Sequence, residues 1–105
     1  MVAMGAAEYC KPEFSKNFHH NSLFVGNSTR QAVAEGRAEF TPVFFSEIPQ
    51  GLRTELRPDV ALIHVSLPDE HGYCSFGISV DYTKPAAECA KTVIAQVNPQ
   101  MPRTL

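Results

Sequence analysis

An unbroken run of apolar or amphipathic side chains stands past the middle of the chain, at Val60–Val65. A run of this kind is typical of a strand that is buried on both faces of a parallel sheet. A polar, turn-rich segment follows at 66–72, and Cys74, Phe76 and Ile78 then alternate with other residues over 73–78. The alternation predicts a second strand. We therefore expect a central strand at 60–65 and a companion strand at 73–78.

The first part of the chain has a weaker pattern. Pro12 interrupts any helix near it, and residues 16–21 are polar apart from one phenylalanine, so we expect irregular structure or a short helix over 1–21. Residues 22–25 are then mostly apolar and are followed by Gly26. This pattern predicts a short buried strand at 22–25.

The clearest helix start lies at Ser28. Gln31 follows it three residues later, which fits a capping box, and Gly36 is placed to end a helix over 29–35. The free N–H groups at such a start could hold an anion. Residues 26–28 lack the spacing of a phosphate-binding or dinucleotide-binding loop, which favours an ordinary junction between strand and helix.

Another strand and a second helix are predicted next along the chain. Residues 40–45 are strand-like, and Pro42 places the start of that strand at a sheet edge. Ser46 can cap the helix that follows, and Pro49 is tolerated in its first turn. Gly51 makes that helix weak and short.

The last part of the chain predicts one more helix and one more strand. Asp81 or Thr83 can cap a helix over 84–90, in which Pro85 fits only the first turn. Residues 92–97 (TVIAQV) then predict a last buried strand, followed by a loop.

Strands and helices therefore alternate along most of the chain. The alternation predicts an α/β fold with a mostly parallel sheet, covering helices and right-handed crossovers. A parallel sheet needs both faces covered, and the predicted helices are few and short. We therefore expect an irregular segment at 1–21 and a partial α/β domain at 22–105 that belongs to a larger unit.

Composition narrows the classes of function. A chain of 105 residues is one domain at most, and its net charge of −2 gives no reason to expect nucleic acid or an anionic membrane as partner. Its three cysteines lack CxxC spacing, which favours reduced thiols. There is no secretory signal pattern and no apolar run of about 20 residues, so we expect a soluble, cytoplasmic protein.

One cluster of residues in the centre of the chain could suggest metal binding or nucleophilic catalysis. Its members are His64, Asp69, Glu70, His71 and Cys74. Their spacing matches no zinc pattern, and in an extended segment residues three apart generally point to opposite faces. We therefore expect no metal, a core thiol at Cys74 and a loop histidine at His71.

The loop after the last predicted strand is the best local candidate for contact with substrate. In open parallel sheets, ligands bind outside the carboxyl ends of the strands. Arg103 could pair with a carboxylate, Asn98 or Gln100 could hydrogen-bond to one, and Met101 could offer apolar surface to the rest of a ligand. A proline-stiffened connector to the rest of a domain fits the same residues.

Several long blocks of the sequence closely resemble the acetyl-CoA hydrolase/transferase family. They are HHNSLFVGNSTR at 19–30, GRAEFTPVFFSEIP at 36–49, DVALI at 59–63, PDEHGYCSFG at 68–77 and NPQMPRT at 98–104. Within that family the chain looks most similar to 4-hydroxybutyrate and butyrate CoA-transferases. The blocks occur in one order over nearly the whole chain, which makes the resemblance more specific than any single motif.

The resemblance implies an α/β domain of the NagB/RpiA/CoA-transferase-like type. It also implies an enzyme, a homo-oligomer, that moves coenzyme A between an acyl-CoA (4-hydroxybutyryl-, butyryl- or acetyl-CoA) and a carboxylate such as acetate. Coenzyme A is then a substrate, and transfer runs through a glutamyl-CoA thioester.

In the family that catalytic glutamate lies in the second half of a much longer chain, so no glutamate of this sequence is nominated. The resemblance therefore implies a partial N-terminal domain without its catalytic C-terminal domain, inactive by itself. The alternative is a non-catalytic, stand-alone α/β domain that acts through self-association or by binding another subunit.

Overall fold

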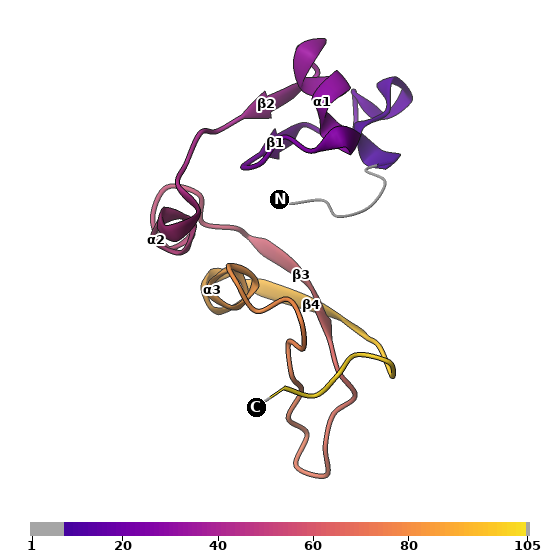
Figure 1. The fold of residues 1–105 in the computed structure, drawn as a ribbon, viewed down its shortest axis with the longest axis vertical. Helices are drawn as coiled ribbons and strands as arrows, with labels where there is room; N and C mark the ends of the chain where they lie inside the picture. Colours follow the sequence, from indigo (N-terminus) through magenta and orange to yellow (C-terminus); the bar gives the residue numbers. More distant parts are fainter. Residues whose placement is uncertain (1–7, 105) are drawn as a thin grey trace. The chain divides into compact units, whose positions relative to one another are not determined.

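The computed structural model describes residues 8–104 and divides the chain into two compact units, Met1–Phe44 and Phe45–Leu105 (Figure 1). Within the described residues, each unit contains one two-stranded parallel sheet. The predicted α/β class with parallel pairing is thereby confirmed. The first seven residues of the segment predicted to be irregular, 1–21, lie outside the described residues.

The first unit is built around α1 and a short sheet. Its elements are two 3-10 helices at Glu8–Cys10 and Pro12–Phe14, β1 at His20–Ser22, α1 at Asn27–Ala34 and β2 at Ala38–Phe40. β1 and β2 pair in parallel, with His20 opposite Ala38 and Ser22 opposite Phe40. α1 packs against β2 and against the first 3-10 helix.

Helix α1 begins two residues earlier than predicted. Gly26, with an extended backbone, is its N-cap residue, and no side chain caps the helix. Gln31 donates instead to the Glu35 carboxylate, one turn further on, at 2.8 Å. The predicted capping box is therefore wrong, because its glutamine pairs forward along the helix rather than back to the cap.

The end of α1 is as predicted. Gly36 has φ +70°, a conformation that glycine adopts without steric strain. The N–H groups of Gly36 and Arg37 donate to the carbonyls of Val33 and Ala32, at 3.1 and 2.9 Å. This pair of hydrogen bonds is a Schellman motif, which satisfies carbonyls that the helix end would leave unpaired.

Both strands of this unit lie earlier in the chain than the strands predicted at 22–25 and 40–45. The Thr41 N–H donates to the Ser22 carbonyl at 3.0 Å, and the next residue, Pro42, has no N–H to continue the ladder. The buried Ser22 hydroxyl donates to the Phe24 carbonyl at 2.5 Å, which turns the chain out of β1. Residues 45–47 form a 3-10 helix instead of extending a strand.

The core of the first unit is small. Cys10, Ala32 and Ala38 are its buried apolar residues, and Tyr9 and Val33 pack against them. Burial raises the pKa of the Cys10 thiol and that of the Tyr9 hydroxyl. Few large side chains are buried in this unit, so its stabilisation by apolar burial is modest.

The second unit carries a longer sheet, whose strands lie side by side in Figure 1. Its elements are a 3-10 helix at Phe45–Glu47, α2 at Ile48–Arg53, β3 at Val60–Val65, α3 at Thr83–Cys89 and β4 at Thr92–Val97. β3 and β4 pair in parallel over their full length, from Val60 opposite Thr92 to Val65 opposite Val97. The predicted bounds of both strands are confirmed.

The helices of this unit differ slightly from prediction. Pro49 lies in the first turn of the short helix α2, as expected, but Glu47 rather than Ser46 is the N-cap residue, without a capping hydrogen bond from its side chain. α3 begins at Thr83, and the Asp81 carboxylate accepts from both the N–H and the hydroxyl of Thr83, each at 3.1 Å. Within residues 8–104, no helix is long and apolar enough to cross a membrane.

Burial in the second sheet contradicts the prediction that its strands are covered on both faces. Ala61 and Val65 of β3 are buried, whereas Val60 is 50% exposed and Leu62 is 69% exposed. Every residue of β4 is exposed. For β3 the reason is that α3, which also contacts α2, packs on the side of Ala61 and Val65, and no element within the described part of this unit packs comparably on the other side. In β4, Val93 and Val97 stay exposed even on the side of Ala61 and Val65.

Candidate functional site

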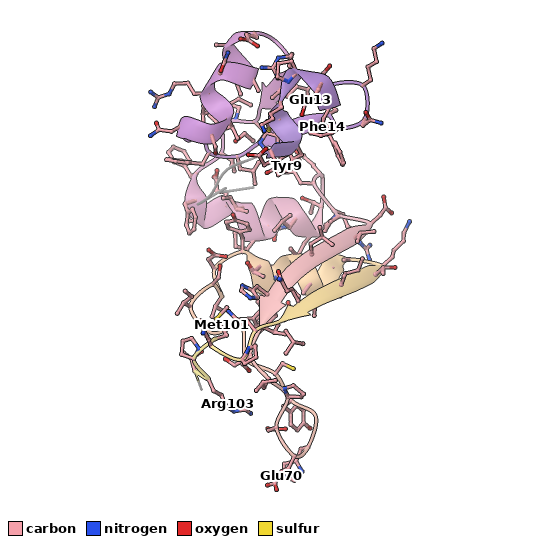
Figure 2. All side chains as sticks on the ribbon, turned by 90° about the vertical axis from the view of Figure 1, so that its right-hand side faces the viewer. Tyr9, Glu13, Phe14, Glu70, Met101 and Arg103 are labelled. Carbon is pink, nitrogen blue, oxygen red and sulfur yellow. The ribbon has the colours of Figure 1, made fainter. Side chains whose placement is uncertain are left out.

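Two segments meet at the carboxyl ends of β3 and β4. A long loop, residues 66–82, follows β3, and a terminal segment, residues 98–104, follows β4. Asn98 donates its N–H to the Val65 carbonyl at 2.9 Å, so the pairing of the strands continues into the terminal segment. Figure 2 labels Glu70 at the tip of the long loop and Met101 and Arg103 on the terminal segment. Parallel α/β sheets bind ligands at this edge.

The long loop contains no strand, so the strand predicted at 73–78 is wrong. Gly72 and Gly77 have φ +83° and +63°, which bends the backbone at both ends of that stretch. Ser75 is held through Ser66: the Ser66 N–H donates to the Ser75 carbonyl, and the Ser75 N–H donates to the Ser66 hydroxyl, both at 2.9 Å. Cys74 is exposed, which corrects the predicted core thiol.

Asp69 organises the tip of the long loop. Its Oδ1 accepts hydrogen bonds from the N–H groups of Tyr73 and His71, at 2.8 and 2.9 Å. Its own N–H donates to the Tyr73 carbonyl at 2.9 Å. The N–H of Tyr73, followed by that of His71 and the charge of Arg103, holds the pKa of the Asp69 carboxyl below its ordinary value.

Arg103 ties the terminal segment to this tip. Its Nη2 lies 2.6 Å from Oδ2 of Asp69, and its Nη1 donates to the Tyr73 carbonyl at 3.0 Å. Arg103 was predicted to bind a substrate carboxylate, but here it binds a carboxylate of its own chain. A guanidinium has five N–H donors, so three remain that these two bonds do not use. Arg103 therefore acts mainly by positioning the terminal segment against the long loop.

A second tie involves the Ser75 hydroxyl. It accepts from the N–H groups of Thr104 and Gly77, both at 3.1 Å, and donates to the Thr104 carbonyl at 2.9 Å. The Thr104 hydroxyl donates to the Gly77 carbonyl at 3.1 Å. The two ties together hold the terminal segment against the long loop at Tyr73, Ser75 and Gly77.

The other three predicted site residues differ in their surroundings. Asn98 forms a turn, because its Oδ1 accepts from the Gln100 N–H at 2.9 Å and its carbonyl accepts from the Met101 N–H at 3.1 Å. Gln100 is exposed. Met101 is half-buried and lies against Gly77, where a Cβ would collide with its Sδ and Cγ. Met101 and Arg103 therefore contact the long loop, while Gln100 faces solvent.

The central cluster of histidine, acidic and cysteine residues is not assembled into a site. Among residues 8–104, no three His, Cys, Asp or Glu side chains lie where they could share a metal ion. His71 Nε2 lies 3.5 Å from the Glu70 carboxylate, and its placement in a loop confirms that part of the prediction. No hydrogen bond joins Cys74 to His71 among the described residues, so the pair forms no nucleophile and base.

Sequence reasoning missed Asp69, Ser66 and Ser75 as the residues that shape this edge. One local signal pointed to Asp69, since an aspartate three residues before a glycine often accepts hydrogen bonds from backbone N–H groups in a turn. Ser66 and Ser75 had no such signal for the contacts that join the segments, because these contacts link Ser66 to Ser75 and Ser75 to Thr104, across 9 and 29 positions.

These features define a parallel α/β unit with two joined segments at the carboxyl ends of its paired strands. Residues 1–104 match the family described as the acetyl-CoA hydrolase/transferase N-terminal domain, and the chain belongs to this family. It is 61% identical, over 106 aligned residues, to a 4-hydroxybutyrate coenzyme A transferase of Clostridium kluyveri. That alignment covers 100% of this chain and 25% of the relative. The chain therefore spans about a quarter of that relative's length.

Solved structures of longer chains contain the same fold. RipA from Yersinia pestis superposes with a TM-score of 0.84 at 29% identity, over 90% of this chain and 24% of RipA. A 4-hydroxybutyrate CoA-transferase from Porphyromonas gingivalis superposes with a TM-score of 0.57 at 40% identity, over 85% of this chain and 26% of that chain. The predicted family and the CoA-transferase-like α/β fold are thereby confirmed.

Proposed function

We propose that this chain is part of an enzyme that moves coenzyme A between an acyl-CoA and a free carboxylate. The observation that carries the proposal is the 61% identity, over the whole chain, to a 4-hydroxybutyrate coenzyme A transferase. The substrates are then 4-hydroxybutyryl-, butyryl- or acetyl-CoA and a carboxylate such as acetate. The enzyme is a cytoplasmic homo-oligomer, and it uses no metal, nucleic acid or membrane.

The reaction requires a carboxylate nucleophile outside this chain. In the proposed sequence, a glutamate of the catalytic domain attacks the acyl-CoA carbonyl, which gives a mixed anhydride and releases CoA thiolate. The thiolate attacks the glutamyl carbonyl of the anhydride, which forms the glutamyl-CoA thioester and releases the first carboxylate. The acceptor carboxylate then takes its place, and the same two steps run in reverse.

The edge formed by the long loop and the terminal segment would serve this reaction by shaping the site. Arg103 and Asp69 fix the two segments, Met101 offers apolar surface beside Gly77, and exposed Gln100 can donate to a substrate carboxylate. Asn98 would shape the site through the turn that it forms with Gln100 and Met101.

A chimera tests the proposal. This chain replaces the matched quarter of the Clostridium kluyveri relative, and transfer of CoA from 4-hydroxybutyryl-CoA to acetate is measured. We expect a folded chimera with transferase activity and none from the 105-residue chain alone. A chimera that folds but transfers no CoA contradicts the proposal, and so does transfer by the short chain, because the nucleophile would then lie within it.

The exposed side of the β3–β4 sheet favours a second candidate, a non-catalytic domain that acts through self-association or by binding another subunit. Light scattering on the 105-residue chain distinguishes the two. A stable dimer together with an inactive chimera supports the second candidate, whereas an active chimera supports the first.

A further inference from the structure

The terminal segment, residues 98–104, is anchored at both ends. At the first end, the Asn98 N–H continues the pairing of β3 and β4 through a hydrogen bond of 2.9 Å to the last residue of β3. At the other end, the Thr104 N–H donates to the Ser75 hydroxyl at 3.1 Å, and the Thr104 carbonyl accepts from that hydroxyl at 2.9 Å. The position of the segment therefore depends on Ser75, a residue of the long loop.

The Ser75 hydroxyl spends its whole hydrogen-bonding capacity inside the protein. A serine hydroxyl has one O–H donor and two acceptor lone pairs. Here the O–H donates to the Thr104 carbonyl, and the oxygen accepts from the N–H groups of Thr104 and Gly77. These three bonds leave neither a proton nor a lone pair for a ligand. The hydroxyl therefore acts on the positions of Gly77 and Thr104, not as a nucleophile or a ligand donor.

Ser75 is itself fixed to the end of β3 by Ser66. Ser66 directly follows β3 and is 3% exposed. Its N–H donates to the Ser75 carbonyl, and its hydroxyl accepts from the Ser75 N–H, both at 2.9 Å. A chain of hydrogen bonds therefore joins the paired strands, through Ser66 and Ser75, to Thr104 at the far end of the terminal segment.

Met101 packs against one of the two residues that Ser75 holds and lies three positions before the other. Its Sδ and Cγ occupy the space that a Cβ at the buried Gly77 would take. The Thr104 hydroxyl donates to the Gly77 carbonyl at 3.1 Å, which closes the same side of this contact. Because one oxygen of Ser75 binds the N–H groups of both Gly77 and Thr104, it fixes the space in which Met101 lies.

We propose that Ser75 is a positioning residue for the transfer of CoA: through Gly77 and Thr104, its hydroxyl holds Met101 and Gln100 where the acceptor carboxylate binds. This inference rests on the proposed function, which places those two side chains at the substrate. Loss of the hydroxyl weakens binding of the acceptor. It leaves the chemical steps largely unchanged, because the nucleophile of the proposed reaction lies outside this chain.

Steady-state kinetics of the full-length chimera test the proposal. Ser75→Ala removes the hydroxyl, and Ser79→Ala, at an exposed position of the same loop, is the matched control. For Ser75→Ala we expect the KM for acetate to rise roughly threefold to tenfold and kcat to change by less than about twofold, because one tie of neutral hydrogen bonds is lost. Ser79→Ala should change neither value.

The division between KM and kcat separates positioning from a general loss of structure. If Ser75 only stabilised the fold, Ser75→Ala would reduce the folded fraction, which lowers the apparent kcat and leaves the KM for acetate unchanged. Either that result or an unchanged pair of constants overturns the proposal.

Thr104→Val tests the same tie from its other end. Valine keeps the shape of threonine and removes the hydroxyl that donates to the Gly77 carbonyl. We expect a smaller rise in the KM for acetate than in Ser75→Ala, because the N–H and carbonyl of residue 104 still bind Ser75. If Ser75→Ala fails to fold, an unchanged KM in Thr104→Val overturns the proposal, since Thr104 is exposed and its variant should fold.

The double variant shows whether the two residues act together. Because Ser75→Ala and Thr104→Val weaken one tie, their combined rise in KM should be smaller than the product of the two single rises. A combined rise equal to that product overturns the proposal.

The test of function remains separate. A folded, unsubstituted chimera that transfers no CoA contradicts the proposed function, and with it the reaction that Ser75 would serve. An active chimera in which Ser75→Ala leaves the KM for acetate unchanged contradicts this inference alone.

Discussion

The Arg103 guanidinium reaches the carboxylate of Asp69, 34 positions earlier in the chain, with Nη2 2.6 Å from Oδ2. The same guanidinium donates to the Tyr73 carbonyl, so a planar side chain with divergent donors joins the terminal segment to two points of the long loop. Because the side chains of Arg103 and Asp69 are 40% and 26% exposed, the pair adds little global stability and acts mainly on the positions of the two segments.

Arg103→Lys should loosen the terminal segment. A lysine ammonium is a point charge that does not reproduce the two-directional binding of a guanidinium. We expect the Met101 and Thr104 amides to exchange hydrogen roughly twofold to fivefold faster, because a half-exposed ion pair is weak. Arg53→Lys is the matched control, since Arg53 pairs with Glu88 on exposed helix surface. Unchanged exchange at 98–104 in the Arg103 variant contradicts the positioning role.

Kinetics of the full-length chimera separate a positioning Arg103 from one that binds substrate. If Arg103 acts through Asp69, Asp69→Asn and Arg103→Lys should raise the KM for acetate by similar factors, because both weaken the same tie. If Arg103 binds the acceptor directly, Asp69→Asn leaves its guanidinium available and changes this KM little. We expect the first result.

The long loop should depend on pH through Asp69. Its folded-state pKa is lowered first by the Tyr73 N–H, so the ionised form stabilises the folded loop. That contribution is fully present above the unfolded value of about 3.9 and is lost as pH falls through the lower folded pKa. The amide proton shifts of Tyr73 and His71, followed by NMR, should therefore titrate with a midpoint below about pH 3.9. In Asp69→Asn this change should be absent, and a midpoint above the ordinary aspartate value contradicts the assignment.

The elements that sequence predicts correctly are those set by near neighbours. Val60–Val65 and Thr92–Val97 form strands with the expected bounds. Helix α1 ends at Gly36 through hydrogen bonds between residues that are only a few positions apart in the sequence. The period-two alternation at 73–78 fails because that stretch is shaped by side chains, chiefly Asp69 and Ser75, rather than by a neighbouring strand. An alternation of apolar and polar residues carries no information about such hydrogen bonds from the backbone to side chains.

The burial of the β3 residues and the geometry of the candidate site show the same limit of sequence-based prediction. Val60 and Leu62 are apolar, but only one side of their sheet has a cover within the described part of the second unit, so their exposure was not predictable from the run itself. The position of Arg103 at the edge of the sheet followed from parallel topology. Its partner Asp69 did not, because nothing in sequence pairs residues 34 positions apart.

Gly77→Ala should destabilise the second unit. Gly77 has φ +63°, and a Cβ there would collide with the Sδ and Cγ of Met101. Backbone strain and overpacking together should lower the free energy of unfolding by about 1–3 kcal/mol. Urea denaturation measures this change.

Two further variants resolve the causes of that loss. Gly72→Ala is the matched control, because Gly72 also has positive φ but nothing lies within 4 Å of its Cβ position. Gly72→Ala should lower the free energy of unfolding only through backbone strain, by about 1 kcal/mol. In a Met101→Ala background, Gly77→Ala should cost less than in the parent chain. Equal losses of stability at both glycines would mean that Met101 adds no steric cost at position 77.

The first unit should lose stability in mild acid because of His20. Burial lowers the pKa of His20, its Nε2 is buried, and within the described residues that atom has no hydrogen-bond partner. The folded state therefore favours neutral imidazole, which packs on the Tyr9 ring at 5.5 Å between centroids. This contribution is present above the unfolded value of about 6.5 and is lost as pH falls toward the lower folded pKa.

Hydrogen exchange of α1 and β1 amides, measured at about pH 7.5 and about pH 5 and corrected for intrinsic rates, tests this. We expect weaker protection at the lower pH. His20→Phe should remove the dependence, because phenylalanine keeps an aromatic ring beside Tyr9 without a titrating group. His19→Gln is the control: His19 is exposed and lies 3.1 Å from Glu39, so the acid sensitivity should persist. If His19→Gln abolishes the acid sensitivity and His20→Phe does not, His19 rather than His20 is responsible for it, and the prediction for His20 is wrong.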